Sequence, residues 1–180
     1  MNSFTEENYL KAIFKLSGID ANEVTTNAIA EKLETKASSV TDMIKKLAHK
    51  KLVIHKKYKG VSLSNKGRGI AISIIRNHRL WEVFLVDKLH FKWDEVHDLA
   101  EELEHIKSDK LINQLDEFLA FPKYDPHGDP IPDKDGNIVR HQDITLADLK
   151  EKEKGIVVGV KEHTISYLNY LEKLTLVLGA

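Results

Sequence analysis

All four prolines of this 180-residue chain lie between residues 122 and 132, and this clustering limits what the chain can fold into. Proline lacks the backbone N–H that helices and sheets use, so the segment 122–136 cannot form regular structure. We interpret it as a boundary and place a linker at 123–142. The boundary leaves an N-terminal part, which we divide into domains at 1–65 and 66–122, and a short segment at 143–180.

The composition is that of an ordinary globular protein, with 42% hydrophobic and 31% charged residues. No stretch reaches the roughly 18 apolar residues of a membrane span, and the N-terminus has no signal-peptide core. There are no cysteines, so disulfides and thiolate metal sites are excluded. We therefore expect a cytoplasmic protein that has no membrane partner.

Charge is distributed unevenly along the chain. Residues 1–70 carry 13 Lys and Arg against 7 Asp and Glu, whereas residues 71–180 carry 14 against 21. This combination of a basic N-terminal segment and an acidic remainder favours a polyanion-binding module that is joined to a second functional part.

The first 65 residues have the order of a winged helix-turn-helix. Apolar periodicity predicts a helix at 4–17 that opens with a capping box, a short helix at 25–33 and a third helix that Ser38 caps. Two β-prone runs, at 52–57 and 61–64, follow with a short turn between them. This order predicts a DNA-binding domain.

Polar and basic side chains on the third helix and the hairpin are the candidate DNA contacts. The N-terminal residues of a recognition helix meet base edges in the major groove, while lysines neutralise phosphates. The candidates are Lys36, Ser38, Ser39, Thr41, Asp42, Lys45 and Lys46 on the helix, and Lys56, Lys57, Tyr58 and Lys59 on the hairpin. The alternative is that these lysines form a solvated face. We favour double-stranded DNA because the cations gather at a turn that follows a helix of recognition-helix length.

After residue 65 the chain is predicted to be mainly α-helical. Helices are expected at 66–88, from Asp94 as N-cap to Ile106, and from Ser108 to Phe121. Past the Pro-rich segment, the pattern predicts a strand at 155–160, an amphipathic helix at 164–174 and the start of another strand at 176–180.

Two stretches of these helices carry His and Glu at helical spacing. His78 and Glu82 are four residues apart, and His97, Glu101 and His105 follow the same step. Each pair taken alone is more often a surface ion pair. However, four acidic residues lie within one and a half turns: Asp98, Glu101, Glu102 and Glu104. Like charges at this spacing destabilise a helix, and a bound dication would compensate their repulsion. The two stretches therefore predict a divalent metal site.

The ligand types restrict the metal. Carboxylate oxygens and imidazoles without thiolates suit Mn(II) or Fe(II), and Zn(II), Co(II) or Ni(II) are expected to substitute in vitro. An enzyme is not expected, and neither is a small-molecule substrate. Glu102-Leu-Glu-His105 is a single Glu-x-x-His, whereas di-iron bundles need two, and there is no nucleophile signature or phosphate loop.

Three motifs together resemble a known family. They are His-Arg-Leu-x-Glu at 78–82, Val-His-Asp-x-Ala-x-x-x-Glu-His at 96–105 and Pro-x-Gly-x-Pro-Ile-Pro at 126–132, and they follow a winged helix. This order is similar to that of the iron/manganese-dependent repressors of the diphtheria toxin repressor (DtxR/MntR) type. The resemblance implies a homodimer with two metal ions per subunit, in which metal activates repression of metal-uptake genes. It also implies that 143–180 is the opening of an SH3-like (FeoA-type) domain.

The resemblance also assigns roles by position. Glu101, Glu104 and His105 correspond to the effector site, and His78, Glu82 and His97 correspond to an ancillary site. Iron-type members have Cys at the position of Glu101, so Glu there favours manganese. Asn8 stands where the family has a ligand on the first helix, whereas Lys11 replaces a carboxylate ligand of the manganese type.

A metal bonded to Asn8 and to the sensor helices would fix the spacing of two recognition helices, which must match half-sites about 34 Å apart. This mechanism predicts that metal tightens operator binding and that Glu104→Ala or His105→Ala abolishes the effect. The alternative is a winged-helix regulator that responds to an organic or protein ligand. A metalloenzyme or metal-storage bundle is the third possibility.

Overall fold

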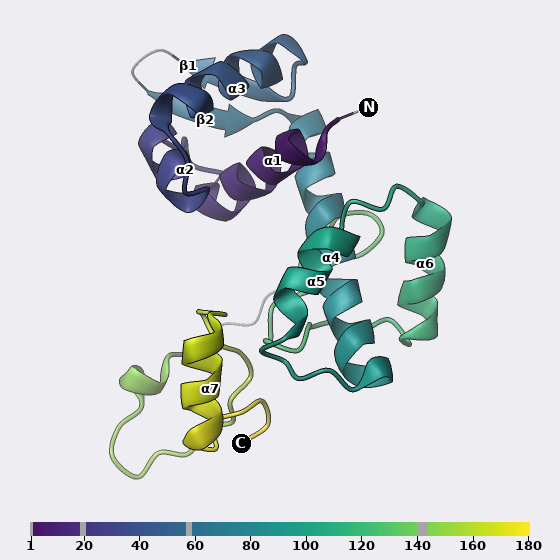
Figure 1. Ribbon diagram of the computed structural model, residues 1–180. Coiled ribbons are helices and arrows are strands. Elements are labelled where there is room, and N and C mark those ends of the chain that lie inside the picture. Colours follow the sequence, from purple (N-terminus) through teal and green to yellow (C-terminus); the bar gives the residue numbers. More distant parts are fainter. Residues whose placement is uncertain (1, 19–20, 57–58, 140–143) are drawn as a thin grey trace. The chain divides into compact units, whose positions relative to one another are not determined.

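The computed structural model describes residues 2–18, 21–56, 59–139 and 144–180. It divides into two compact units, Met1–Ile75 and Arg76–Ala180. The long helix α4 (Asn65–Leu89) runs through the boundary between them (Figure 1). Among the described residues, no helix is both long enough and apolar enough to span a bilayer.

The first unit contains the predicted helices and hairpin. The elements are α1 (Phe4–Ser17), α2 (Thr26–Lys32), α3 (Ala37–His49), β1 (Val53–Lys56) and β2 (Gly60–Leu63) (Figure 1). The strands are antiparallel, with Val53 opposite Leu63, and Val24 adds an isolated bridge to Val61. The fully buried core residues are Leu10, Ile13, Ile29, Val40, Ile44, Leu47 and Val61, which are the apolar positions of these elements.

Local chemistry sets the helix starts in this unit. The predicted capping box at the start of α1 is present, because Ser3 Oγ accepts from the Glu6 N–H and Glu6 accepts from the Ser3 N–H. Thr25 caps α2 as predicted. The prediction that Ser38 caps α3 is wrong. Lys36 is the N-cap, with an extended backbone and no side-chain cap bond, and Ser38 lies inside the first turn.

The close approach of β2 to Val24 depends on Gly60. Its φ is +133°, and a Cβ there would lie 2.8 Å from the Val24 carbonyl oxygen. A side chain would therefore be strained by its own backbone and would clash with a neighbouring main chain. Glycine at this position lets β2 pass close to Val24.

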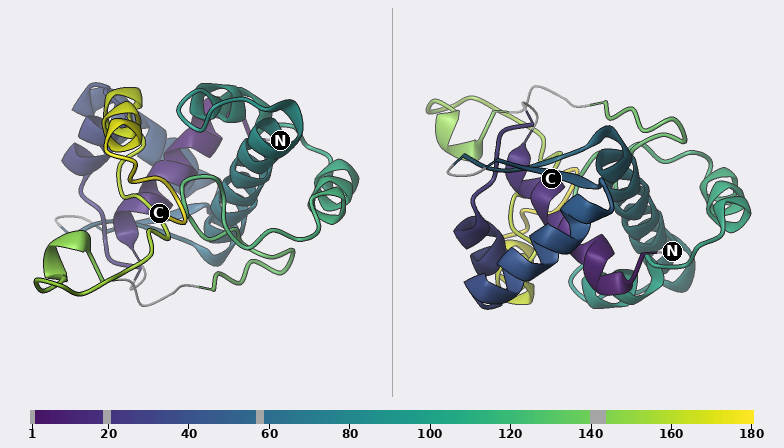
Figure 2. Two further views of the ribbon diagram at one scale, coloured as in Figure 1. Left: turned by 90° about the horizontal axis from the view of Figure 1, so that it is seen from below. Right: turned by 90° about the horizontal axis from the view of Figure 1, so that it is seen from above.

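The second unit is built on the second half of α4. Helices α5 (Val96–Leu103) and α6 (Asp109–Phe118) lie on different sides of α4 (Figures 1 and 2). The core cluster is formed by Leu80, Val83, Ile112, Leu115, Leu119 and Ile131, with Trp81 and Phe84 packed against it. Ile131 belongs to the Pro-rich segment, so part of that segment packs into the core of this unit.

The two helices after α4 are shorter than predicted. Helix α5 begins at Val96 and ends at Leu103, so Glu104 and His105 lie in the turn that follows it. Helix α6 has Ser108 as its N-cap, as predicted, but ends at Phe118. The reversal after it has a physical cause, because Ala120 and Phe121 have positive φ values of 59° and 57°.

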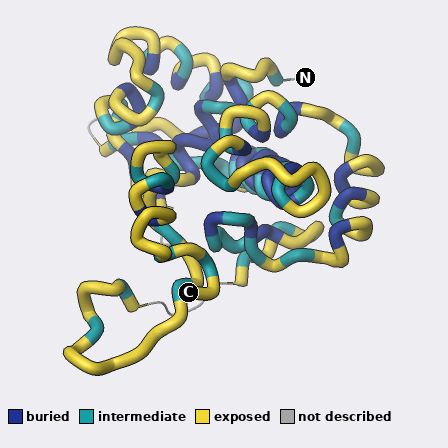
Figure 3. The backbone as a smooth tube through the Cα atoms, turned by 60° about the horizontal axis from the view of Figure 1, so that its bottom comes forward, coloured by how far each residue is buried: buried dark blue, intermediate teal, exposed yellow. Residues whose placement is uncertain are grey.

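The C-terminal segment differs from the prediction. Helix α7 (Ile165–Lys173) and a short 3-10 turn (Leu146–Asp148) are present, but the predicted strands at 155–160 and 176–180 are absent from the described residues. Two backbone hydrogen bonds join Val157 to Gly179 and Ala180 without forming a strand. Most residues between 144 and 180 are exposed (Figure 3). An SH3-like domain therefore remains only a prediction for this segment.

Candidate metal centre

A network of buried and half-buried carboxylates and imidazoles lies in the second unit. Helix α4 contributes His78 and Glu82, α5 contributes His97 and Glu101, and the turn after α5 contributes Glu104. Glu82 and Glu104 are each 1% exposed, and His78 is 6% exposed. Burial of ionised groups is costly unless they are paired or bind a cation, so this network needs a compensating charge.

The first cluster is formed by His78, His97 and Glu101. One ligand atom from each lies within 4.8 Å of the others. Glu101 Oε1 is 3.6 Å from His97 Nε2 and 3.9 Å from His78 Nδ1, and the two imidazole rings meet edge to face with centroids 5.0 Å apart. The i, i+4 spacing of His97 and Glu101 on α5 therefore produces the predicted convergence with His78 of α4.

The second cluster is formed by Glu82, Asp125 and His127, which are all buried. Glu82 Oε2 is 3.6 Å from His127 Nδ1, and Asp125 Oδ1 is 3.9 Å from the same nitrogen. Asp125 and His127 belong to the Pro-rich segment that we predicted as a linker. Within its described part this segment has no helix or strand, but it places His127 at 0% exposure beside α4.

The environment of His127 selects which nitrogen can bind a metal. His127 Nε2 is 2.8 Å from the Trp93 carbonyl oxygen, which can only accept, so Nε2 carries a proton. Nδ1 is buried, has no hydrogen-bond partner and faces Glu82. The imidazole is held between the Trp93 and His163 rings, at centroid distances of 6.1 and 4.5 Å. Nδ1 is therefore the atom of His127 that is available to a cation.

Glu82 belongs to the second cluster and also faces the first. Its Oε1 is 3.0 Å from His78 Nε2 and 3.5 Å from His97 Nδ1, while its Oε2 faces His127. Burial raises the pKa of the Glu82 carboxyl, but the imidazoles of His127, His78 and His97 outweigh burial and hold this pKa below its usual range. Glu82 is therefore a carboxylate at neutral pH and can face a cation on either side.

His78 is hydrogen-bonded at both ring nitrogens. Nδ1 is 2.7 Å from Glu104 Oε2, and Nε2 is 3.0 Å from Glu82 Oε1. Both ring nitrogens are therefore already engaged by a carboxylate. A metal ligand needs a free lone pair, so His78 can bind a cation only by giving up one of these two hydrogen bonds.

The remaining predicted ligands lie elsewhere. His105 is 8% exposed, and its Nε2 is 3.7 Å from Glu104 Oε1. It does not continue the face of His97 and Glu101, because α5 has already ended. Asn8 is on α1 in the first unit, and its Oδ1 is buried without a hydrogen-bond partner.

The residues present fit a divalent cation. His97 Nδ1 and His127 Nδ1 are both buried and have no hydrogen-bond partner, which is costly unless something binds there. The donors in both clusters are imidazole nitrogens and carboxylate oxygens, the set that suits Mn(II), Fe(II) and Zn(II).

The sequence interpretation missed Asp125 and His127. The signal was present, because Asp125-Pro-His-Gly-Asp129 places an imidazole between two carboxylates. Proline excludes regular structure, but it does not exclude burial.

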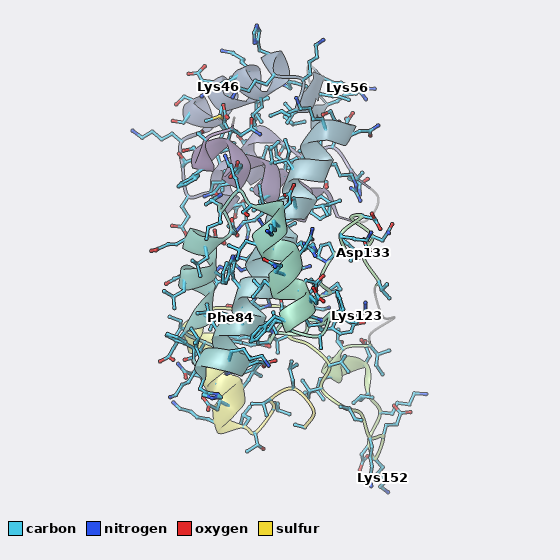
Figure 4. All side chains as sticks on the ribbon, turned by 90° about the vertical axis from the view of Figure 1, so that its right-hand side faces the viewer. Lys46, Lys56, Phe84, Lys123, Asp133 and Lys152 are labelled. Carbon is cyan, nitrogen blue, oxygen red and sulfur yellow. The ribbon has the colours of Figure 1, made fainter. Side chains whose placement is uncertain are left out.

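The predicted DNA contacts of the first unit lie on exposed positions. Lys36, Ser38, Ser39, Asp42, Lys45, Lys46, Lys56 and Lys59 are exposed, and Thr41 is half-buried with its hydroxyl donating to the Ala37 carbonyl. Lys57 and Tyr58 lie outside the described residues. The Lys46 and Lys56 side chains are each 56% exposed (Figure 4), and they pair with Glu6 and Glu23 at 3.1 and 2.8 Å.

Two family models match the chain. "Iron dependent repressor, N-terminal DNA binding domain" matches residues 1–61, and "Iron dependent repressor, metal binding and dimerisation domain" matches residues 64–133. The second match includes Asp125 and His127. The matches therefore cover the winged-helix unit and the part of the second unit that carries both clusters.

Individual proteins show the same similarity. The chain is 31% identical to the diphtheria toxin repressor of Corynebacterium jeikeium over 148 residues, which are 82% of this chain but 61% of that protein. A solved manganese-dependent transcriptional repressor in complex with manganese is 37% identical, with a TM-score of 0.85 over 97% of this chain and 80% of that one. ScaR with bound Zn²⁺ is also 37% identical, with a TM-score of 0.76 over 97% and 81% of the two chains. The chain therefore belongs to the diphtheria toxin repressor (DtxR/MntR) family of iron- and manganese-dependent transcriptional repressors.

Proposed function

We propose that this protein is a metal-dependent transcriptional repressor, which binds operator DNA as a homodimer when Mn(II) or Fe(II) is bound. The observation that carries the proposal is the position of Glu82, a buried carboxylate with imidazoles from three segments around it. Such an arrangement serves as a cation site, and it belongs to a chain whose first unit is a winged helix.

Two ions per subunit are proposed, one for each cluster. His78, His97 and Glu101 would hold the first, and Glu82, Asp125 and His127 the second. A bound dication would supply the positive charge that these carboxylates need. His78 would give up one of its two hydrogen bonds to free a lone pair, and His127 would keep its Nε2 proton on the Trp93 carbonyl. Glu104, His105 and Asn8 remain predicted ligands.

The choice of metal rests on the donor set. Glu101 supplies an oxygen where a thiolate would favour softer metals, so Mn(II) or Fe(II) is the proposed effector. Zn(II), Co(II) and Ni(II) are expected to bind in vitro because they stand higher in the Irving–Williams order than Mn(II). The similar structures with manganese and with Zn²⁺ support this range.

The DNA and dimer contacts are proposed from exposed surfaces. The first turn of α3, with Ser38 and Ser39, would meet base edges, and the lysines of α3 and the hairpin would contact phosphates. For the dimer, α6 exposes Leu111 and Phe118 to 40% and 64%. The ring centroid of Phe118 lies 6.4 Å from that of Phe84 on α4, and Figure 4 labels Phe84. Exposed aromatic surface of this kind is typical of an interface.

A DNA mobility-shift assay on the native promoter tests the proposal, first with chelator and then with Mn(II), Fe(II) or Zn(II). Tight binding is expected only with metal. Glu101→Gln should weaken the response, whereas Glu102→Gln, an adjacent position of α5 outside both clusters, should not. Equal affinity with and without every metal would disprove metal control and favour an organic or protein effector.

A further inference from the structure

Arg79 connects α4 to the Pro-rich segment beside the second cluster. Its side chain is 13% exposed and lies one helical turn before Glu82. Nη2 donates to Asp129 Oδ2 at 2.7 Å, Nη1 donates to the Pro130 carbonyl oxygen, and Nε is 3.5 Å from Asp125 Oδ2. One guanidinium therefore contacts three acceptor groups of the same loop.

The loop that Arg79 contacts is closed around Asp125. Asp125 Oδ1 accepts from the backbone N–H of His127 at 2.8 Å and from that of Asp129 at 3.0 Å. This carboxylate therefore fixes the loop from inside, while Arg79 fixes it from α4. Together these bonds determine where Asp125 Oδ2 and His127 Nδ1 lie relative to Glu82.

Charge adds to the specificity of the contact. The Arg79 guanidinium stays charged in proteins, and it lies beside the carboxylates of both Asp125 and Asp129. Its planar fork reaches several acceptors at once, which the single ammonium of a lysine cannot do in the same geometry.

We propose that Arg79 is a positioning residue for the second cluster, which holds Asp125 and His127 opposite Glu82 without itself binding the ion. The inference rests on the proposed function of that cluster. Arg76 provides a matched comparison, because it lies one turn earlier on α4 and makes a buried pair with Asp116 of α6 at 2.7 Å. Neither Arg76 nor Asp116 belongs to either cluster.

The test counts bound Mn(II) in the full chain by equilibrium dialysis, with free Mn(II) measured by electron paramagnetic resonance. The unaltered protein should bind two ions. Arg79→Gln should bind one Mn(II) ion with unchanged affinity and the other at least tenfold more weakly. Arg79→Lys should bind this second ion with an affinity between those of Arg79→Gln and the unaltered protein. Arg76→Gln should bind two. If Arg79→Gln binds both ions as tightly as the unaltered protein, Arg79 is not a positioning residue.

A second variant keeps the inference testable if Arg79→Gln does not fold. Asp129→Asn removes the shortest charged contact of Arg79 at a side chain that is 37% exposed, so folding should persist. Asp129→Asn should bind one of the two Mn(II) ions severalfold more weakly and the other with unchanged affinity. Loss of both ions in Asp129→Asn, or of neither, would overturn the inference. If the unaltered protein binds no Mn(II), the proposed function fails instead, whatever the variants do.

Discussion

His78 and Glu104 lie on different elements of the second unit, yet His78 Nδ1 is 2.7 Å from Glu104 Oε2. The other nitrogen of the same ring bonds to Glu82, which in turn faces His127. A line of alternating imidazoles and carboxylates therefore runs from Glu104 to the second cluster. Because His78 bonds to both Glu104 and Glu82, a change at Glu104 alters the bonding available to Glu82.

Glu104→Ala tests the end of this line. The buried carboxylate disappears, and His78 Nδ1 loses its 2.7 Å contact with Glu104 Oε2. Metal should then fail to tighten operator binding in a mobility-shift assay. Glu102→Ala, at a position two residues earlier and outside both clusters, is the control and should keep the full response. A Glu104→Ala protein that folds and still responds to Mn(II) would show that Glu104 is dispensable.

Glu82→Gln tests the carboxylate of the second cluster that also faces the first. The change keeps the size of the side chain but removes the charge that faces His78, His97 and His127. Both ions should bind at least tenfold more weakly, because each cluster lies against one of the two Glu82 oxygens. Isothermal titration with Mn(II) measures this directly. Loss of one ion alone would mean that Glu82 serves a single cluster.

Much of the first unit could be predicted because its signals are local. The Ser3–Glu6 capping box and the Thr25 cap fix helix starts within three residues of themselves, and both are present. The side chains of His78 and Glu82, and of His97 and Glu101, are adjacent for the same reason, since each pair lies within about one helical turn.

The second cluster could not be predicted in this way. His127 reaches Glu82 across 45 positions of sequence, and what holds it there is the set of contacts that Arg79 and Asp125 make. Such contacts have no periodicity. The end of α5 was missed for a related reason, because the apolar pattern continues to Ile106 although the helix ends at Leu103. His105 therefore does not lie on the helix face that its spacing predicted.

Glu6 gives a prediction of stability against pH. Burial raises the pKa of its carboxyl, but Lys50, the Ser3 N–H and Lys46 outweigh burial and lower this pKa from 4.5 to about 2. A lowered pKa means that the stabilisation is complete above the unfolded value and is lost as the pH falls from about 4.5 to 2. Because the lysines are partly exposed, roughly 1–2 kcal/mol is expected at neutral pH.

Urea unfolding of the unaltered protein and of Glu6→Gln, in chelator, measures this difference. Other carboxyl groups titrate equally in both proteins, so the difference in free energy of unfolding isolates Glu6. The two proteins should differ at pH 7 and converge near pH 2. A difference that stays constant over this range would assign the effect to packing rather than to charge.

Gly128 tests the contact between the His127 loop and the C-terminal segment. Its φ is +87°, and a Cβ there would lie 2.1 Å from the Val158 carbonyl oxygen and 2.3 Å from Gly159 Cα. These are backbone atoms, so they cannot move aside as a side chain would. Val160 N–H also donates to the His127 carbonyl at 2.9 Å, so the clash falls where the segment joins the loop.

Gly179→Ala is the matched control, because Gly179 has nearly the same φ of +85° and a Cβ there would meet nothing within 4 Å. Both variants carry the strain of a left-handed alanine, about 1–2 kcal/mol. Only Gly128→Ala should also increase hydrogen exchange at the Val160 N–H. It should also lower the affinity for one Mn(II) ion in equilibrium dialysis, because His127 is the neighbouring residue. Equal behaviour of the two variants in both measurements would mean that the close approach at Gly128 does not hold the segment against the metal loop.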